Sequence, residues 1–334
     1  MAELGVETCL GIESTADNLG IGVVRSDGVI LANVITTHVP EKGGIHPREA
    51  ARHHARVMGE TLSEALETAS IVARDLDYIA FSQGPGMGPS LRTGATAARA
   101  LAARLGVPLV GVNHCIAHIE IGRLTTGAVD PLSLYVSGGN TLVTGFESGY
   151  YRIFGETLDI AIGNCLDTFS REAGLPYPGG PAVEQLALDG RTLIPLPYVV
   201  KGMDLSYSGL LTAVTKAFRT GKWRLEDLCF SLQEVAYSML GEVTERALAH
   251  TGKQELLLTG GVGANNRLRA MVDSIAEEHG ATPKFVPIRY ATDNGAMIAW
   301  TGVIAFRSGV TTPINKSHID PMWRLDRVEV PWRS

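Results

Sequence analysis

The sequence lacks the signatures of several common protein classes. Its four cysteines include no C-x-x-C pair, which argues against a zinc ribbon or a disulfide framework and favours a reducing compartment. The N-terminus carries Glu3 and Glu7 where a signal peptide would carry basic residues. No run approaches the roughly eighteen uninterrupted apolar residues of a membrane span. We therefore expect a cytoplasmic protein without a membrane segment.

An excess of positive charge is also missing. The chain has 29 Lys and Arg against 35 Asp and Glu, a net charge of -6. Because non-specific nucleic-acid binding depends on neutralising phosphates, such a chain is a poor general binder of RNA or DNA. Any nucleic acid would need a local basic surface or help from partner subunits. The series Arg48, Arg52 and Arg56 is one candidate surface, although such a series is more often an ordinary solvated helix face.

The order of expected strands and turns occurs twice along the 334 residues. Strands are expected at 8–12, 20–24, 29–35, 78–82 and 109–112, and again at 132–136, 141–146, 151–157 and 256–258. Apolar periodicity predicts helices at 47–69, 91–105, 225–250, 265–278 and 293–306. We therefore expect an α/β protein of two duplicated halves, residues 1–130 and 131–334, around a cleft, with an insertion at about 160–225.

Three glycine-rich turns have the composition of phosphate-binding loops: Ser82–Pro89, Ser137–Thr141 and Gly260–Asn265. Backbone N–H groups close on a phosphate only where side chains do not obstruct them. Any one of these loops is more simply a tight turn, but three in one chain favour a nucleotide site. None fits the P-loop or the G-x-G-x-x-G pattern, so neither of those sites is predicted.

His114 and His118 are four residues apart, so on a helix both imidazoles would point at one ion. On spacing alone, two core or surface histidines are an equally good interpretation. A metal site needs a third ligand, for which Asp293 is a candidate, although it would also serve as a helix cap. The chain lacks the His-Glu-x-x-His order, since Cys115 follows the first histidine, which disfavours a zincin-type protease.

Four further carboxylates stand at expected strand or helix ends. Glu13 follows a buried strand and would project into the cleft, or else be a solvated turn residue. Asp159, Asp167 and Glu184 border the insertion. Asp167 would equally cap a helix and Glu184 would equally face solvent.

Taken together, the motifs resemble those of a known family. The segments that carry the resemblance are residues 11–15, 43–48, 82–86, 113–120, 135–141, 159–167, 178–181, 260–262 and 292–297. They are similar, over about residues 8 to 310, to the TsaD family, the catalytic subunit of tRNA threonylcarbamoyladenosine synthesis. Tyr135 and the run Gly163–Asp167 resemble the archaeal and eukaryotic branch, which works inside the KEOPS complex.

The resemblance implies the actin-like ATPase fold with two ribonuclease H-like halves. It implies a tRNA-processing acyltransferase, which transfers threonylcarbamoyl from threonylcarbamoyl-adenylate to N6 of the adenosine 3′ to the anticodon. The tRNAs concerned read codons that begin with A. An ATPase or sugar-kinase-like phosphotransferase on the same fold is the main alternative, and it would use a carboxylate base and magnesium in place of two histidines. A non-catalytic scaffold would leave the intact site residues without a purpose.

The resemblance also assigns site residues. It implies a divalent metal on His114, His118, Asp293 and, in this branch, Tyr135. Two imidazoles, a phenolate and a carboxylate suit iron or zinc better than magnesium, and iron is expected. ATP or the adenylate would be held by Tyr135, Val136, Ser137, Gly138, Gly139, Asp167, Gly180, Glu184 and Asn265.

The general base is a choice between Glu13 and a water molecule. The first turn reads Glu13–Asn18, where archaeal relatives commonly have Gly and then His-Thr, so no role is carried over to that turn. The expected partners are tRNA, a small RIO-type kinase or ATPase, a dimerising subunit and an accessory tRNA-binding subunit. The chain ends at Ser334 without the kinase domain that some archaeal relatives fuse to it, so we expect that partner as a separate polypeptide.

Overall fold

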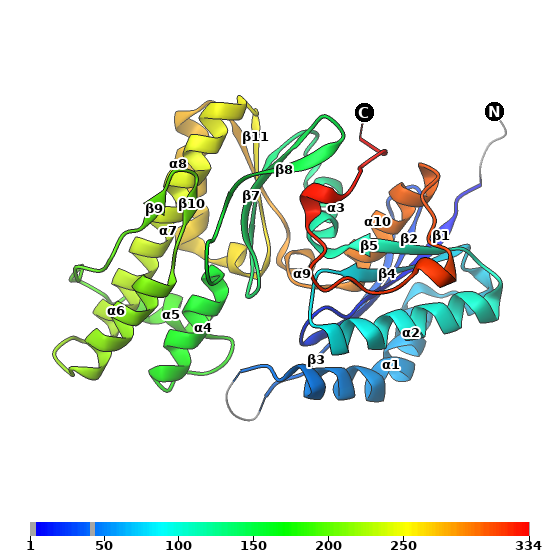
Figure 1. Cartoon of the computed structure of the whole chain (residues 1–334), viewed down its shortest axis with the longest axis horizontal. Coiled ribbons are helices and arrows are strands. Elements are labelled where there is room, and N and C mark those ends of the chain that lie inside the picture. Colours follow the sequence, from blue (N-terminus) through cyan, green and yellow to red (C-terminus); the bar gives the residue numbers. More distant parts are fainter. Residues whose placement is uncertain (1–4, 41–43, 334) are drawn as a thin grey trace. The chain divides into compact units, whose positions relative to one another are not determined.

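The chain forms two compact units in a computed structural model that describes residues 5–40 and 44–333 (Figure 1). Glu3 and Gly43, which the sequence analysis used, lie outside the described residues. Unit 1 comprises Met1–Leu124, Glu147–Tyr151 and Asp293–Ser334, and unit 2 comprises Thr125–Phe146 and Arg152–Thr292. Among the described residues, no helix combines the length and apolar character that crossing a membrane requires.

Unit 1 contains a five-stranded sheet in the order β3-β2-β1-β4-β5. The strands are β1 (Thr8–Glu13), β2 (Asn18–Arg25), β3 (Ile30–Thr37), β4 (Tyr78–Gly84) and β5 (Leu109–Asn113). The helices are α1 (Pro47–Ala69), α2 (Gly88–Leu105), α3 (His114–Thr126) and α10 (Gly295–Arg307), with 3-10 turns η1 (Ala73–Asp75), η3 (Ile314–Lys316) and η4 (Leu325–Arg327). In Figure 1, α1 and α2 cover one face of this sheet and α10 covers the other.

Side-chain alternation along β1 explains how these two faces differ. Leu10 and Ile12 belong to the apolar core shared with α1 and α2. The intervening Gly11 faces α10, because a Cβ at Gly11 would lie 2.2 Å from the Ala299 nitrogen. Gly22 on β2 faces α10 in the same way. The helix backbone therefore lies almost directly on the sheet, at a distance that only glycine allows.

Unit 2 contains a second five-stranded sheet in the order β12-β11-β6-β7-β8. Its strands are β6 (Leu132–Val136), β7 (Thr141–Glu147), β8 (Tyr150–Glu156), β11 (Glu255–Thr259) and β12 (Thr282–Phe285), with a small ribbon of β9 (Val200–Lys201) and β10 (Asp204–Leu205). Its helices are α4 (Ile162–Glu172), α5 (Gly179–Ala187), α6 (Ser208–Arg219), α7 (Leu225–Thr251), α8 (Asn266–Glu278) and α9 (Ile288–Ala291), with a 3-10 turn η2 (Gly261–Ala264). The apolar core of the unit is built around α7.

The two sheets repeat one topology. In unit 1 the first strand, β1, pairs antiparallel with β2 and parallel with β4. In unit 2 the first strand, β6, pairs antiparallel with β7 and parallel with β11. The predicted duplicated α/β fold is confirmed.

The units divide the chain differently from the single boundary at residue 130 that the repeat suggests. The segment from Asp293 onward returns to unit 1, because α10 packs on the glycine-lined face of β1 and β2. The short connection Glu147–Tyr151 also belongs to unit 1, where Val330 donates a backbone hydrogen bond to the Gly149 carbonyl. The division into two units follows from contacts between residues far apart in sequence, and the repeated order of strands along the chain does not reveal such contacts.

Gly22→Ala tests the close approach of α10. The new Cβ would lie 2.2 Å from the Ala296 nitrogen, so we expect the free energy of unfolding to fall by roughly 3 kcal/mol in urea titrations followed by circular dichroism. Gly59→Ala is the matched control, since Gly59 is exposed on α1 and none of the described atoms meets its Cβ within 4 Å. That control should stabilise by about 0.5–1 kcal/mol. Equal stabilities of the two variants would contradict this packing.

Candidate functional site

Helix α3 begins directly at the end of β5, which places its first histidine at the edge of the sheet. Asn113 caps the start of α3, since its Oδ1 accepts hydrogen bonds from the backbone nitrogens of Cys115 at 3.0 Å and Ile116 at 3.2 Å. This side chain satisfies N–H groups that the first helical turn otherwise leaves unpaired. His114 and His118 follow one turn apart, with ring centroids separated by 4.7 Å. The helical spacing predicted for the pair is confirmed.

Asp293, which is distant in sequence but belongs to the same unit, contacts both histidines. Its Oδ1 lies 3.0 Å from His118 Nε2 and 3.5 Å from His114 Nε2. The alternative interpretation of Asp293 as the cap of the following helix is wrong, because α10 begins at Gly295 and its cap is Asn294, whose Oδ1 accepts from the Met297 nitrogen at 3.0 Å. The Asp293 carboxylate is thereby left to the histidines.

The three side chains have the spacing of a metal site. One ligand atom from each of His114, His118 and Asp293 lies within 4.8 Å of the others. Nitrogen and oxygen ligands at about 2.0–2.2 Å from a tetrahedral ion lie roughly 3–4 Å from one another. The cluster therefore fits one divalent ion, and two imidazoles with one carboxylate are a donor set that iron and zinc accept.

Glu13 is fully buried and supports the histidine cluster from β1. Its Oε2 lies 3.0 Å from His114 Nδ1, and its Oε1 accepts hydrogen bonds from the nitrogen and the hydroxyl of Thr15. The interpretation of Glu13 as a solvated turn residue is wrong. A carboxylate on the second nitrogen of a histidine orients the ring and directs the other nitrogen, here Nε2, at a metal.

The cluster attracts positive charge. Burial alone would lower the pKa of His114, but the carboxylates of Glu13 and Asp293 outweigh it and raise the pKa to about 9. Burial would raise the pKa of Asp293, but the charge of His114 and the hydrogen bond with His118 lower it to about 2. Burial lowers the pKa of His118, against the opposing effect of Asp293. A proton on His114 or a cation among the ligands would each balance the carboxylates of Glu13 and Asp293.

In unit 2, the predicted nucleotide residues Asp167 and Glu184 connect successive helices. Asp167 lies within α4, and its Oδ1 accepts from the Gly179 nitrogen at 2.7 Å, in the first turn of α5. Glu184 lies within α5, and its Oε1 accepts from the backbone and side-chain nitrogens of Asn266 at the start of α8. Each carboxylate therefore stabilises a helix N-terminus other than its own. The interpretation of Glu184 as merely facing solvent is wrong.

Asn265 and Asp159 act in the same manner at neighbouring helix starts. Asn265 caps α8, accepting from the Leu268 nitrogen at 3.0 Å, and donates to Gln233 on α7 at 2.9 Å. Asp159 accepts from the Tyr207 nitrogen at 2.9 Å at the start of α6. Together these bonds fix the starts of α5, α6 and α8.

The turn between β6 and β7 leaves its glycines open. Ser137 Oγ accepts from the Gly139 and Asn140 nitrogens at 3.3 and 3.1 Å, which closes the turn on itself. A Cβ at Gly138 or Gly139 would meet no described heavy atom within 4 Å. The hydroxyl of Tyr135, on buried β6, accepts from Asn140 Nδ2 at 3.3 Å. The turn thus leaves space above its glycines, while the N–H groups of Gly139 and Asn140 donate to Ser137 Oγ.

The glycine-rich turn at Ser82–Pro89 is different. The nitrogen of Gly86 donates to the Pro321 carbonyl and the nitrogen of Met87 donates to the Thr15 carbonyl. These two N–H groups are therefore used within unit 1, and the role of this turn in phosphate binding stays a prediction.

The predicted residues fall into one set in each unit. Unit 1 brings His114, His118, Asp293 and Glu13 together. Unit 2 carries the other predicted residues, which are Tyr135, Val136, Ser137, Gly138, Gly139, Asp167, Gly180, Glu184 and Asn265. Sequence reasoning missed the roles of Thr15 and Asn113. Asn113 carried a usable signal, since an Asn directly before a helix is a frequent cap.

Comparison with known proteins identifies first the fold class and then the family. The archaeal HypF of T. kodakarensis matches in structure with a TM-score of 0.65 at 15% identity, covering 91% of this chain and 49% of that one. With the duplicated sheets, this likeness defines a protein of the actin-like ATPase fold.

The family model described as TsaD, tRNA N6-adenosine threonylcarbamoyltransferase, matches residues 29–300. A protein of that name from Thermofilum pendens is 59% identical over 97% of each chain. Another from Thermococcus kodakarensis is 58% identical over 97% of this chain and 99% of its own. The chain belongs to the TsaD family of tRNA-modifying transferases.

His118→Ala tests the metal cluster. Loss of one of three ligand side chains should weaken divalent-ion binding by more than about 100-fold, since even supporting residues contribute 10–100-fold. Metal analysis of the purified protein and zinc titration against a chromogenic chelator would measure the change. The matched control is His250→Ala, because His250 is an exposed histidine at the end of α7. Equal zinc affinity in the two variants would exclude His118 as a ligand.

Proposed function

We propose that the chain transfers a threonylcarbamoyl group from threonylcarbamoyl-adenylate to N6 of the adenosine 3′ to the anticodon, in tRNAs that read codons beginning with A. Membership of the TsaD family gives the reaction class. The observation that carries the proposal is the convergence of His114, His118 and Asp293 from distant segments. A kinase on the same fold would have no use for two buried imidazoles.

The metal proposed for this cluster is one divalent ion, iron or alternatively zinc, with Tyr135 as a fourth ligand. Such an ion, when bound, would neutralise negative charge on the phosphate leaving group. His114 and His118 would present Nε2 to it, and Asp293 would present a carboxylate oxygen. Glu13 would keep His114 in the required orientation through the 3.0 Å contact with Nδ1.

The adenylate, or ATP, is assigned to the Tyr135–Gly139 turn together with Asp167, Gly180, Glu184 and Asn265. The phosphate would lie against the turn where Gly138 and Gly139 leave space. Asp167 and Glu184 hold the starts of α5 and α8 and so fix the backbone around Gly180 and Asn265. Orienting an activated acyl group against a large RNA supplies much of the acceleration in such a transfer.

Proton removal from the adenosine N6 is assigned to Glu13 or to a water molecule. Both Glu13 oxygens already have partners in Thr15 and His114. Glu13 is also fully buried, which favours the water and leaves Glu13 to orient His114.

The proposed partners are tRNA and the subunits of a KEOPS-type assembly: a small RIO-type kinase or ATPase, a dimerising subunit and an accessory tRNA-binding subunit. A net charge of -6 supports the need for such help, since an acidic chain attracts RNA poorly. The reaction is proposed to take place in the cytoplasm.

Asp293→Asn tests the proposed function. Purified wild-type protein is incubated with tRNA, threonine, bicarbonate, ATP, the adenylate-forming enzyme and the candidate partners, and tRNA nucleosides are analysed by mass spectrometry. We expect threonylcarbamoyladenosine with the wild type and a loss of at least about 100-fold with Asp293→Asn.

The control for that experiment is His250→Ala, which should modify tRNA at the wild-type rate. Circular dichroism establishes that Asp293→Asn is folded. Full modification by the folded Asp293→Asn variant would remove the metal cluster from the reaction. ATP hydrolysis by the wild type without any tRNA modification would favour the phosphotransferase alternative.

A further inference from the structure

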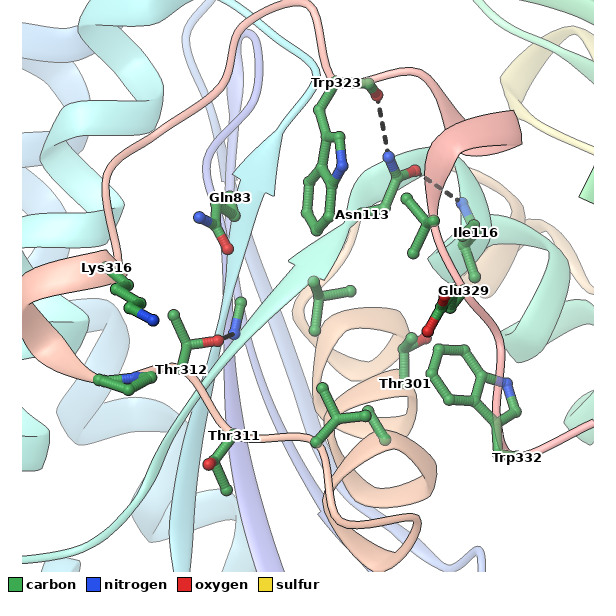
Figure 2. Close-up of a pocket in the computed structure, with 16 residues that line it drawn as sticks. Gln83, Asn113, Ile116, Thr301, Thr311, Thr312, Lys316, Trp323, Glu329 and Trp332 are labelled. Atoms are coloured by element: carbon green, nitrogen blue, oxygen red, sulfur yellow. Dashed lines mark hydrogen bonds between the residues drawn. The ribbon is translucent and has the colours of Figure 1, made fainter. Parts of the chain in front are cut away.

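The chain that follows α10 returns to the beginning of α3. The Thr312 nitrogen donates to the Leu109 carbonyl of β5 at 2.7 Å, and Asn113 Nδ2 donates to the Trp323 carbonyl at 2.9 Å. Figure 2 shows this second bond beside the bond between Asn113 and Ile116. Asn113 therefore caps α3 with one end of its amide and holds the C-terminal segment with the other.

A cavity of about 280 Å³ remains between this segment, β5 and α10. Its polar side chains mostly hold the segment in place: besides Asn113, Gln83 donates to the His318 carbonyl at 2.7 Å and Thr312 accepts from the Gly111 nitrogen. These polar side chains of the cavity are therefore occupied in attaching the C-terminal segment to unit 1.

A second attachment is made at Glu120, two residues after His118. The side chain is 1% exposed. Its Oε1 accepts from the Tyr151 hydroxyl at 2.6 Å and from Trp332 Nε1 at 3.1 Å, and its Oε2 accepts from Arg123 at 2.6 Å. Arg333 extends this network by donating to the Tyr151 hydroxyl at 2.9 Å. A buried carboxylate is tolerable only with such a complete set of donors.

The attachment at Glu120 holds α3 on the side away from the metal cluster. At 100° per residue, Glu120 projects roughly 140° around the helix from the mean direction of His114 and His118. The same stretch of chain provides Asp293 at its beginning and Trp332 near its end. The stretch from Asp293 to Trp332 therefore supplies the third proposed ligand and also contacts the helix that carries the other two.

We propose that Glu120 is a positioning residue for the metal cluster, fixing the rotation of α3 through its bonds to Tyr151 and Trp332 so that both histidines meet Asp293. This inference rests on the proposed metal site. A buried ionic network is weak evidence for stability but is well suited to selecting one arrangement among several. Metal affinity is the property that such selection would change.

Trp332→Phe is the mild test in the full-length chain, because it keeps an aromatic ring and removes only the N–H donor to Glu120. Glu120→Gln is the strong test, since a glutamine has one acceptor oxygen where the carboxylate has two, so its NH2 group would face either the Arg123 donor or the Trp332 donor. Zinc dissociation constants, measured against a chromogenic chelator, should rise about 3-fold for Trp332→Phe and about 10-fold for Glu120→Gln. The matched control is Trp223→Phe in unit 2, where the side chain is 42% exposed, and it should stay within about twofold of the wild type.

Melting temperatures of the metal-free proteins separate positioning from simple support. Variants that melt earlier but bind zinc within twofold of the wild type would overturn the inference. If Glu120→Gln does not fold, the Trp332→Phe result alone decides. If the His118→Ala variant binds zinc as tightly as the wild type, the metal site of the proposed function is overturned. That outcome is distinct from a failure of the inference about Glu120.

Discussion

The contact of Asp293 with two histidines is the interaction on which the candidate site depends. The partners Asp293 and His118 are 175 residues apart in sequence, and they meet because α10 begins where β1 and β2 offer it a backbone-only surface. Glycines at positions 11 and 22 allow that approach. Any side chain there would push the start of α10, and with it the carboxylate, away from the imidazoles.

Burial makes the side chains of this cluster depend on one another for charge compensation. Glu13 and the two histidines are nearly inaccessible to solvent, so their charges are compensated by one another and not by water. Two carboxylates against two imidazoles leave the balance to a proton or a metal ion. Because both histidines lie on α3 and Asp293 does not, a small rotation of α3 would change the distances between them, which is why the hydrogen bonds of Glu120 bear on the site.

The duplicated topology has been used differently in the two units. In unit 1 the turn after the first strand carries Glu13 and Thr15, whose hydrogen bonds are directed to each other and to His114. In unit 2 the equivalent turn is Ser137–Asn140, closed by the serine hydroxyl and open above its glycines. A single architecture therefore carries a group of candidate metal ligands in one unit and an open glycine turn in the other, which illustrates that side chains and not the fold determine chemistry.

The sequence by itself determined the order of strands and helices, the duplication and the helical pairing of the histidines, because each is written in residues within a few positions of one another. It also carried enough motifs to indicate the family. Only the tertiary structure decided that Asn294 and not Asp293 caps α10, that Glu13 supports His114 across 101 positions, and that the C-terminal segment belongs to unit 1. These facts depend on which distant surfaces pack together, and packing is settled by the whole chain rather than by local periodicity.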